Sequence, residues 1–293
     1  MRVKSLSETS KSMFTIEAPA KINLTLEVLG TRPDGYHEIR SLIQTLKFCD
    51  SLQLTPAESI RITCNLPDWS LEQSLVTKAI KLLQAATGCT KGATIKITKR
   101  IPLLSGLAGD SSDAAAILRG LNQLWQLELL QQQLQEITQQ LGSDVTFFLT
   151  GGTALMEGRG EKIMPLPPVP HQWVILISPK VLILPDKTKR LYSMLKPCHY
   201  SDGTITDKLA ADLKSGRKFK ASSLFNIFEN VAFTRGEELT HYRDHILKIG
   251  ALKIHLAGSG STLFTLLEDK SQAEDLLTRL KNQGLETFLT ETG

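Results

Sequence analysis

Alternating apolar and polar positions near the start of the chain predict a β-strand with one buried face. The apolar positions of this strand are Ile22, Leu24, Leu26 and Val28. Asn23 lies between two of them and should therefore point away from the core. Residues 32–35 read Arg-Pro-Asp-Gly, where proline fixes one backbone angle and glycine permits a positive one, so we expect a tight turn after the strand.

Further patterns in the first half predict a lobe of mixed helices and strands. A helix lies between two strand-like runs, and an amphipathic helix starts at Ser112, directly after a glycine-rich loop. A solvated, glutamine-rich helix over 131–140 and a strand over 153–157 follow. The strand-like runs are 60–64 and 93–98, and the helix between them carries Leu75, Ala79, Leu82 and Leu83 on one face.

A cluster of prolines separates the two halves of the chain. These prolines, which suit a linker, are Pro165, Pro167, Pro168 and Pro170. We therefore expect an N-terminal domain over 1–165 and a C-terminal domain over 166–293. The second half reads as strand 173–178, helices within 222–233 and 237–249, strands 253–256 and 262–267, helix 271–281 and strand 285–289. Ser271 and Glu274 have the spacing of a capping box, and the whole order predicts an α+β architecture.

The composition is that of an ordinary globular protein. Hydrophobic residues make up 41% and charged residues 22% of the chain, so burial can offset chain entropy without metals or cross-links. The net charge is only +4, which is weak support for a nucleic-acid surface and equally compatible with small anionic ligands. The 4 cysteines are widely spaced, as expected for reduced thiols.

The apolar runs are too short for a membrane span, which needs about 20 residues. We therefore expect a cytoplasmic protein that does not bind membranes. The basic, serine-rich start is the one argument for the alternative, a remnant transit peptide and a plastid location, and Glu8 argues against it.

The glycine-rich loop from Pro102 to Ser112 is the strongest candidate for a ligand site. Small side chains let a phosphate approach the backbone, and the helix that follows adds free amides and a favourable dipole. A tight strand-to-helix connection capped by Ser111 or Ser112 would have the same composition. The loop has neither a Walker ending nor a dinucleotide fingerprint, so a lysine for the phosphates must come from elsewhere.

Four segments, taken in order, carry a family resemblance. They are 18–24, with Pro-Ala-Lys-Ile-Asn-Leu, the loop 102–112, Leu-Gly-Ser-Asp-Val at 141–145 and Leu-Ala-Gly-Ser-Gly-Ser at 256–261. In this order they resemble the GHMP superfamily, which contains galactokinase, homoserine kinase, mevalonate kinase and phosphomevalonate kinase. The resemblance spans nearly the whole chain. It implies a two-lobed α+β GHMP kinase fold, with an N-terminal lobe like domain 2 of ribosomal protein S5 and a ferredoxin-like C-terminal lobe.

Three motifs narrow the resemblance to one family. Pro-Ala-Lys-Ile-Asn-Leu, Arg-Pro-Asp-Gly-Tyr-His at 32–37 and Ser-Ser-Asp-Ala-Ala-Ala at 111–116 are similar to those of the 4-diphosphocytidyl-2-C-methyl-D-erythritol kinases. That family uses ATP with Mg²⁺ to phosphorylate the 2-hydroxyl of its substrate in the non-mevalonate (methylerythritol phosphate) route of isoprenoid and terpenoid biosynthesis. The resemblance thus implies a small-molecule substrate, a cytidine-diphosphate methylerythritol, and no nucleic acid; we expect a monomer or weak homodimer.

The resemblance also implies roles for individual residues. Asp144 matches the catalytic base, and Lys21 matches the lysine that holds this carboxylate ionised and stabilises charge on the transferring group. ATP would bind along the loop residues Pro102, Leu103, Leu104, Ser105, Gly106, Leu107, Ala108, Gly109, Asp110, Ser111 and Ser112. The substrate would contact Asn23, Tyr36, His37, Gly258, Ser259 and Gly260. Taken alone, each of these residues also suits an ordinary strand, turn or hairpin position.

Within this set, Lys21 and Asn23 share a strand face and could reach one ligand. Tyr36 offers a stacking face and His37 offers hydrogen-bonding groups, which suit the cytidine base. Residues 182–187 do not align cleanly with the family, so we assign no role to Thr188 or Tyr192.

Two positions depart from the family pattern. Asp110 stands where a glycine or asparagine is usual, and it places a negative charge beside the proposed phosphate site. It would either cap the helix amides, which we favour, or help to hold Mg²⁺. Ser74 stands where the family often carries an asparagine near the adenine, so the adenine contacts and the metal ligands are not assigned.

Two other functions fit parts of the sequence. A sister kinase acting on mevalonate or homoserine would share the loop, but Tyr36 and His37 speak against it. A nucleic-acid-binding module could use the loop for backbone phosphates, and it predicts salt-sensitive RNA binding without ATP turnover.

Overall fold

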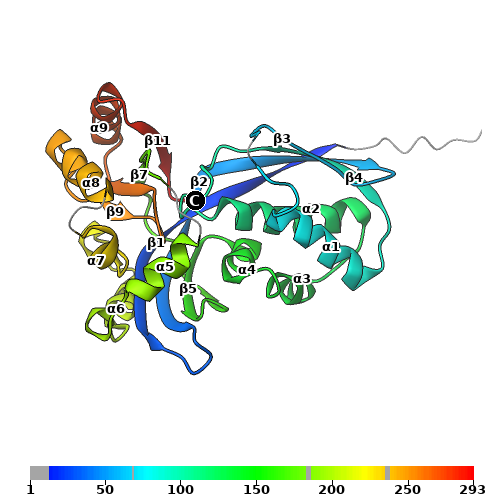
Figure 1. Ribbon diagram of the computed structural model, residues 1–293, viewed down its shortest axis with the longest axis horizontal. Helices are drawn as coiled ribbons and strands as arrows, with labels where there is room; N and C mark the ends of the chain where they lie inside the picture. Colours follow the sequence, from blue (N-terminus) through cyan, green and yellow to red (C-terminus); the bar gives the residue numbers. More distant parts are fainter. Residues whose placement is uncertain (1–12, 68, 183–185, 235–237) are drawn as a thin grey trace, which may run out of the picture.

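Two sheets, one based in each half of the chain, organise the structure (Figure 1). The computed structural model describes residues 13–67, 69–182, 186–234 and 238–293. The first sheet runs in the order β3-β4-β2-β1-β8, with β5 attached to β2 and β6 attached to β5, and the second runs β11-β7-β10-β9. Helices and strands mix in both halves, which confirms the predicted α+β class.

A long hairpin forms the centre of the first sheet. β1 (Phe14–Thr31) and β2 (His37–Ala57) pair antiparallel across the predicted turn, where Gly35 has a φ of 81°. β2 pairs with β5 along 39–44 and with β4 along 51–57. The other strands of this region are β3 (Arg61–Cys64), β4 (Gly92–Thr98), β5 (Thr153–Gly158) and β6 (Lys162–Pro165).

Both faces of β1 are buried, so the prediction of a single buried face was wrong. Ile22 and Leu24 pack into a cluster with Val174 of the second sheet. Lys21 and Asn23, on the opposite face, are only 5% and 6% exposed. The second half of the chain covers the face that an isolated sheet would leave to water, and a local pattern cannot reveal this.

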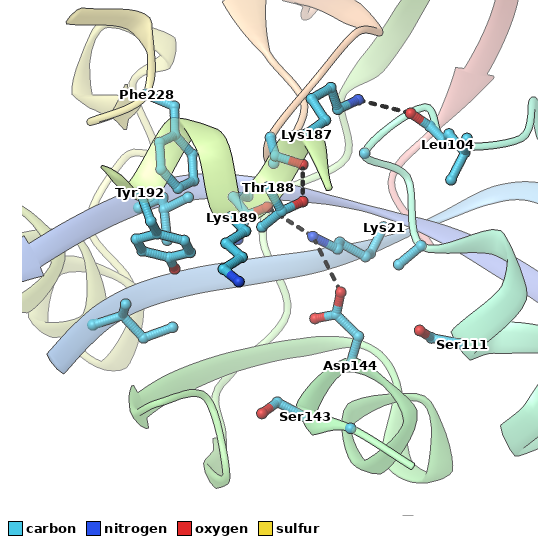
Figure 2. Close-up of a pocket in the computed structure, with 18 of the residues that line it drawn as sticks. Lys21, Leu104, Ser111, Ser143, Asp144, Lys187, Thr188, Lys189, Tyr192 and Phe228 are labelled. Carbon is cyan, nitrogen blue, oxygen red and sulfur yellow. Dashed lines mark hydrogen bonds and ion pairs between the residues drawn. The ribbon is translucent and has the colours of Figure 1, made fainter. Parts of the chain in front are cut away.

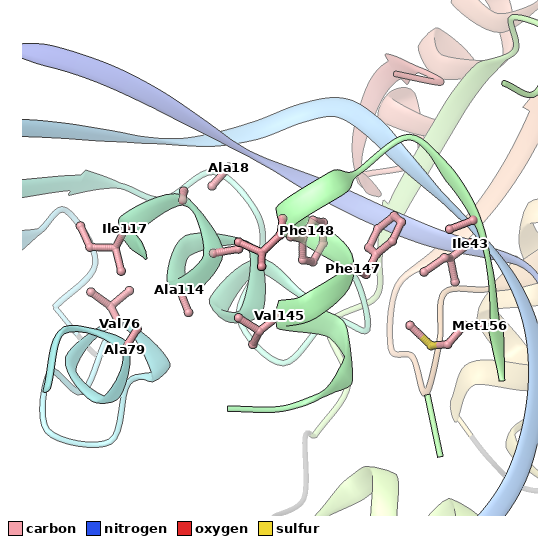
Figure 3. Packing of buried hydrophobic residues seen from close by; sticks show 14 of the residues in the cluster. Ala18, Ile43, Val76, Ala79, Ala114, Ile117, Val145, Phe147, Phe148 and Met156 are labelled. Atoms are coloured by element: carbon pink, nitrogen blue, oxygen red, sulfur yellow. The ribbon is translucent and has the colours of Figure 1, made fainter. Parts of the chain in front are cut away.

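Four helices cover the first sheet (Figure 1). They are α1 (Leu75–Thr87), α2 (Gly109–Trp125), α3 (Gln131–Thr138) and α4 (Ser143–Thr150). Apolar side chains of α1, α2 and α4 meet in one cluster (Figure 3). Trp125 of α2 is its largest fully buried side chain, and Phe147 and Phe148 of α4 follow in size. Burial of each phenylalanine ring stabilises the fold by roughly 1.5–3 kcal/mol. This packing fixes the starts of α2 and α4 against the sheet, and both helix starts face the site described below.

The second sheet is antiparallel. It consists of β7 (Trp173–Ser178), β9 (His255–Leu256), β10 (Leu263–Leu267) and β11 (Glu286–Glu291), with α8 (Glu238–Ile249) and α9 (Lys270–Asn282) beside it. Glu237, predicted to start α8, lies outside the described residues. The predicted capping box was wrong, because Asp269 is the N-cap of α9 and accepts a hydrogen bond from the Gln272 amide at 2.8 Å.

Several elements between the two sheets escaped prediction. They are α5 (Lys187–Met194), α6 (Thr204–Lys214), β8 (Phe225–Asn226) and the 3₁₀ turns Pro197–His199 and Ala221–Ser223. The helix predicted within 222–233 is present as α7 (Glu229–Ala232). β8 pairs parallel with β1, so the second half of the chain adds a strand to the first sheet. The domain boundary at 165/166 stays a prediction.

All 4 cysteines are free, as predicted. Among the helices of the described residues, none combines the length and the apolar character needed to cross a membrane.

Candidate active site

A large cleft is lined by residues from both halves of the chain. It has a volume of about 1220 Å³, and the loop after β4, the starts of α2 and α4, the turn between β1 and β2, and α5 all contribute to it. Pockets for single small ligands usually measure about 300–1,000 Å³. The cleft therefore has room for two substrates side by side.

Most of the residues predicted for the site line this cleft. They are Lys21, Asn23, Tyr36, His37, Pro102, Leu103, Leu104, Ser105, Gly106, Ala108, Gly109, Asp110, Ser111, Asp144, Gly258 and Ser259. Leu107, Ser112 and Gly260 are not among the lining residues. Leu107 packs into the core. Ser112 lies within α2, and its side chain is buried.

Lys21 and Asp144 face each other across the cleft (Figure 2). The Lys21 Nζ atom lies 3.7 Å from Asp144 Oδ2 and donates a hydrogen bond of 2.9 Å to Asn23 Oδ1. Asn23 in turn donates to Ser41 Oγ at 2.8 Å, which fixes its amide group. The Asp144 side chain is 36% exposed, whereas that of Lys21 is 6% exposed. The Asp144 carboxylate is thus open to a ligand, whereas the Lys21 ammonium is buried and held by its hydrogen bond to Asn23.

The start of α2 presents unpaired amides to the cleft. The helix begins at Gly109, earlier than predicted, and its N-cap Ala108 provides no side-chain hydrogen bond. Ser112 is the first residue of the helix start whose amide has a hydrogen-bond partner. This amide donates to the Ala108 carbonyl at 3.0 Å. Capping by Ser111 or Ser112 and capping by Asp110 were therefore wrong interpretations. Free amides at the positive end of the dipole suit an anion.

The glycine-rich loop is tied to the loop of the second half. The Thr262 amide donates to the Ser105 carbonyl at 3.0 Å, and the Lys21 amide donates to the Leu107 carbonyl at 3.1 Å. Gly106 has a φ of 85°, and a Cβ there would meet the Ala257 carbonyl at 2.0 Å. A Cβ on Gly258 would meet the Gly106 carbonyl at 2.9 Å and Lys21 Nζ at 3.3 Å. Glycine is required at both positions because the two loops touch.

A cluster of buried charges under the loop was not predicted. Lys99 Nζ lies 2.6 Å from Asp50 Oδ2, 2.7 Å from Asp113 Oδ2 and 3.6 Å from Asp110 Oδ1. Burial by itself lowers the pKa of Lys99, but attraction to Asp113 and Asp50 outweighs it and raises the pKa. Asp50 Oδ1 also accepts the amides of Arg100 and Ile101, at 2.5 and 2.8 Å. The cluster therefore anchors both ends of the loop to the first sheet.

Aromatic rings line the end of the cleft near the β1–β2 turn. His37 stacks on Tyr192 of α5, with ring centroids 4.8 Å apart and an interplanar angle of 22°. Burial lowers the pKa of His37, so its imidazole is neutral at physiological pH and can both donate and accept. Burial, with a smaller effect from Asp144, raises the pKa of Tyr192 to about 12. Tyr36 is 56% exposed, and the Arg159 guanidinium lies 4.8 Å from the centre of its ring.

Residues of α5 were missed by sequence reasoning. Thr188 Oγ1 lies 2.8 Å from Ser259 Oγ, and Lys187 donates to the Leu104 carbonyl at 2.8 Å. These residues line the cleft together with Tyr192 (Figure 2). The family resemblance assigns no role to Thr188 or Tyr192, because the segment 182–187 before them does not align cleanly with the family.

Ser74 does not line the cleft. It is the N-cap of α1, and its Oγ accepts a hydrogen bond from the Thr77 amide at 3.2 Å. Within the described residues, no group of three His, Cys, Asp or Glu side chains could hold a metal ion.

Comparison with known proteins defines the class of this chain. Models of two families match it: the GHMP kinases N terminal domain over residues 74–152 and the GHMP kinases C terminal domain over residues 209–285. A crystal structure of mevalonate kinase from L. major is 16% identical in sequence, covers 98% of this chain and 98% of its own, and superimposes with a TM-score of 0.70. The chain is a GHMP kinase in fold and in domain content.

Relatives of higher identity narrow this class. A 4-diphosphocytidyl-2-C-methyl-D-erythritol kinase from Dehalococcoides mccartyi is 49% identical over 280 residues, which cover 96% of this chain and 98% of the relative. A crystal structure of 4-(cytidine 5'-diphospho)-2C-methyl-D-erythritol kinase is 30% identical, covers 96% of this chain and 99% of its own, and superimposes with a TM-score of 0.81. The chain therefore belongs to the 4-diphosphocytidyl-2-C-methyl-D-erythritol kinase family and is a small-molecule kinase.

Proposed function

We propose that this protein transfers the γ-phosphoryl group of ATP to the 2-hydroxyl of 4-diphosphocytidyl-2-C-methyl-D-erythritol. The observation that carries the proposal is the Asp144–Lys21 pair, which lies in one cleft with both the glycine-rich loop and the aromatic end. Family membership supports the substrate, and the volume of the cleft supports the binding of two ligands.

In this proposal ATP lies with its phosphates against the free amides at the start of α2. The γ-phosphoryl group then points toward Asp144, which is exposed enough to reach the substrate hydroxyl. Asp144 takes the hydroxyl proton as the oxygen attacks phosphorus, and ADP leaves. The Lys21 ammonium stabilises the negative charge that develops on the attacking oxygen and the transferring group.

Mg²⁺ would enter with the ATP phosphates, because Mg²⁺ is commonly held by substrate phosphates, waters and one or two carboxylates. The described residues offer no ready-made site for it, so we derive no step through the metal.

The aromatic end would hold the cytidine diphosphate. The neutral His37 imidazole has one donor and one acceptor for the edge of the base, and the rings of Tyr36 and Tyr192 offer stacking faces. Arg159, at the same end, supplies a guanidinium for the diphosphate. Replacing Tyr192 by alanine should raise the KM for the cytidine substrate about tenfold and leave the KM for ATP unchanged, because a base–aromatic stack contributes roughly 1–3 kcal/mol.

Coupled ADP release tests the function. The purified chain is assayed with ATP and Mg²⁺ against the diphosphocytidyl alcohol, mevalonate and homoserine in parallel. We expect turnover with the first alcohol only, and its loss in Asp144→Ala. Turnover with mevalonate or homoserine in preference would support a sister kinase. RNA binding with no turnover on any alcohol would support the nucleic-acid alternative.

A further inference from the structure

Lys187 joins two loops that line the cleft. It is the first residue of α5, and its Nζ atom donates hydrogen bonds to the carbonyls of Leu104, in the glycine-rich loop, and Gly260, in the loop after β9. The next residue, Thr188, contacts Ser259 of the same second loop. The start of α5 thus reaches both loops at once (Figure 2).

The charge of Lys187 distinguishes it from the two buried lysines of the cleft. Lys21 faces Asp144, and Lys99 faces Asp50 and Asp113, so each has a carboxylate partner. Among the described residues, the hydrogen-bond acceptors of Lys187 are neutral carbonyls and none of the ion pairs includes it. A half-buried ammonium without a counter-ion is costly, and an anionic ligand would offset that cost.

The glycine-rich loop has the opposite imbalance of charge. The loop residues 102–112 include neither lysine nor arginine, and Asp110 adds a negative charge at the start of α2. An ammonium group has three donors, and the two carbonyls occupy two of them. The third proton is free for an oxygen of a ligand in the cleft, without the loss of either loop contact.

We propose that Lys187 binds the terminal phosphates of ATP and so supplies the cation that the glycine-rich loop lacks. The second half of the chain thereby contributes a charge to the nucleotide site and holds both loops around the phosphates. The proposal rests on the proposed function only in taking ATP as the ligand.

Direct binding tests this role. The affinity of the full chain for a non-hydrolysable ATP analogue is measured by calorimetry with Mg²⁺, for the unaltered protein, Lys187→Met and Lys187→Arg. Lys189→Met is the matched control, because Lys189 lines the same cleft from the same helix. We expect Lys187→Met to bind the analogue about 10- to 100-fold more weakly, since a hydrogen bond to a charged group contributes roughly 1.5–3 kcal/mol. Lys187→Arg should recover part of the loss, and Lys189→Met should change little.

Three results would overturn the proposal. The first is an unchanged affinity for the analogue in Lys187→Met, and the second is an equal loss of affinity in Lys189→Met. The third is a parallel loss of affinity for the analogue and for the diphosphocytidyl alcohol together with a lower melting temperature, which would show that Lys187 only holds the loops together.

The pH dependence gives a second readout. Burial lowers the pKa of Lys187 to about 8, so its positive charge is present below this pH and is lost above it. Affinity for the analogue should therefore fall between pH 7 and pH 9, and this fall should be absent in Lys187→Met. The other charged groups that line the cleft around it are Lys21, Asp34, Lys99, Asp110, Asp144 and Arg159, with Asp186 and Lys189 beside it in the chain. These groups are the same in both proteins, so the difference between the two curves isolates Lys187.

Failure of this inference and failure of the proposed function are separable. If the chain does not phosphorylate the diphosphocytidyl alcohol but binds the analogue through Lys187, the proposed function fails and the inference stands. If turnover is observed and Lys187→Met binds the analogue normally, the reverse holds.

Discussion

Lys21 of β1 and Lys99, the residue after β4, are both buried lysines, and both line the same cleft. Their partners differ. Lys99 lies between Asp50 and Asp113, whose side chains are fully buried, at 2.6 and 2.7 Å. Lys21 has one carboxylate partner, Asp144, at the longer distance of 3.7 Å and with a side chain that is 36% exposed.

This difference shows that the burial of a lysine does not by itself indicate its role. A cation between buried carboxylates is neutralised and holds the fold together, whereas a cation whose one carboxylate opens to the cleft can act on a ligand. We therefore expect changes around Lys21 to affect turnover and changes around Lys99 to affect stability. The following predictions test that division.

The largest effect is expected for Asp144→Asn. The amide keeps the size of the side chain but cannot take the hydroxyl proton, so kcat should fall about 10³-fold, within the roughly 10²–10⁴-fold range of general-base catalysis. The free energy of unfolding should change little, because the Asp144 side chain is partly exposed. Coupled ADP release and thermal unfolding measure the two quantities. A mutant with near-normal kcat would remove Asp144 from the role of base.

Lys99→Met should act in the opposite way. It leaves the Asp50 and Asp113 side chains buried without their cation, and breaking a buried pair in this way costs about 3–5 kcal/mol. Denaturant unfolding should show this loss. Lys96→Met is the control, because Lys96 lies on β4 with an exposed side chain. If Lys99→Met were as stable as the control, the cluster would not be the anchor that we infer.

A smaller effect is expected for Ser41→Ala. Ser41 Oγ accepts from Asn23 at 2.8 Å and donates to the Thr25 carbonyl at 2.6 Å, so it orients the amide that holds Lys21. We expect kcat to fall about fivefold with an unchanged KM for ATP, because loss of a typical hydrogen bond costs about 1 kcal/mol. Ser51→Ala, on the same strand, should leave kcat unaltered. Equal kcat values for the two variants would show that Lys21 needs no support from Ser41.

Two kinds of feature could be predicted from the sequence. The first are regular elements whose apolar positions repeat over several turns or residue pairs, and the second are residues within strong motifs. β1, α1, α2 and the strands of the second sheet fall in the first group, and Lys21 and Asp144 in the second. The second strand of the central hairpin, β2, was not predicted. The roles of these two residues and of the other site positions stay predictions, although the structure places most of them in one cleft.

The missed elements lack a local signal. α5 has no buried residue, so its sequence shows no apolar stripe, and β8 is two residues long. The pairing of Lys99 with Asp50 and Asp113 joins residues that are distant in sequence, and nothing in their neighbourhoods predicts it. For the same reason the local pattern predicts only one buried face for β1, since the residues that cover one of its two faces come from the second half of the chain.

Asp110 is the one carboxylate of the Lys99 cluster that reaches the cleft, and it gives the smallest and sharpest test of the comparison. Its side chain is 45% exposed and lies 3.6 Å from Lys99 Nζ, beyond the two buried partners. Because Lys99 is already neutralised, Asp110→Asn should cost less than about 1 kcal/mol of stability, as for other exposed pairs. Removal of a negative charge from the start of α2 should tighten ATP binding about two- to fivefold.

The alternative role of Asp110, as a Mg²⁺ ligand, predicts the reverse. Asp110→Asn would then need more Mg²⁺ for half-maximal activity and would bind ATP more weakly. A titration of ADP release against Mg²⁺ at saturating ATP, beside the affinity for the ATP analogue, separates the two roles. We expect an unchanged Mg²⁺ requirement, because the Asp110 carboxylate already lies 3.6 Å from the Lys99 ammonium. Tighter ATP binding at an unchanged Mg²⁺ requirement would give Asp110 a structural role, like that of Lys99. A raised Mg²⁺ requirement would instead give it a role in catalysis, like that of Lys21.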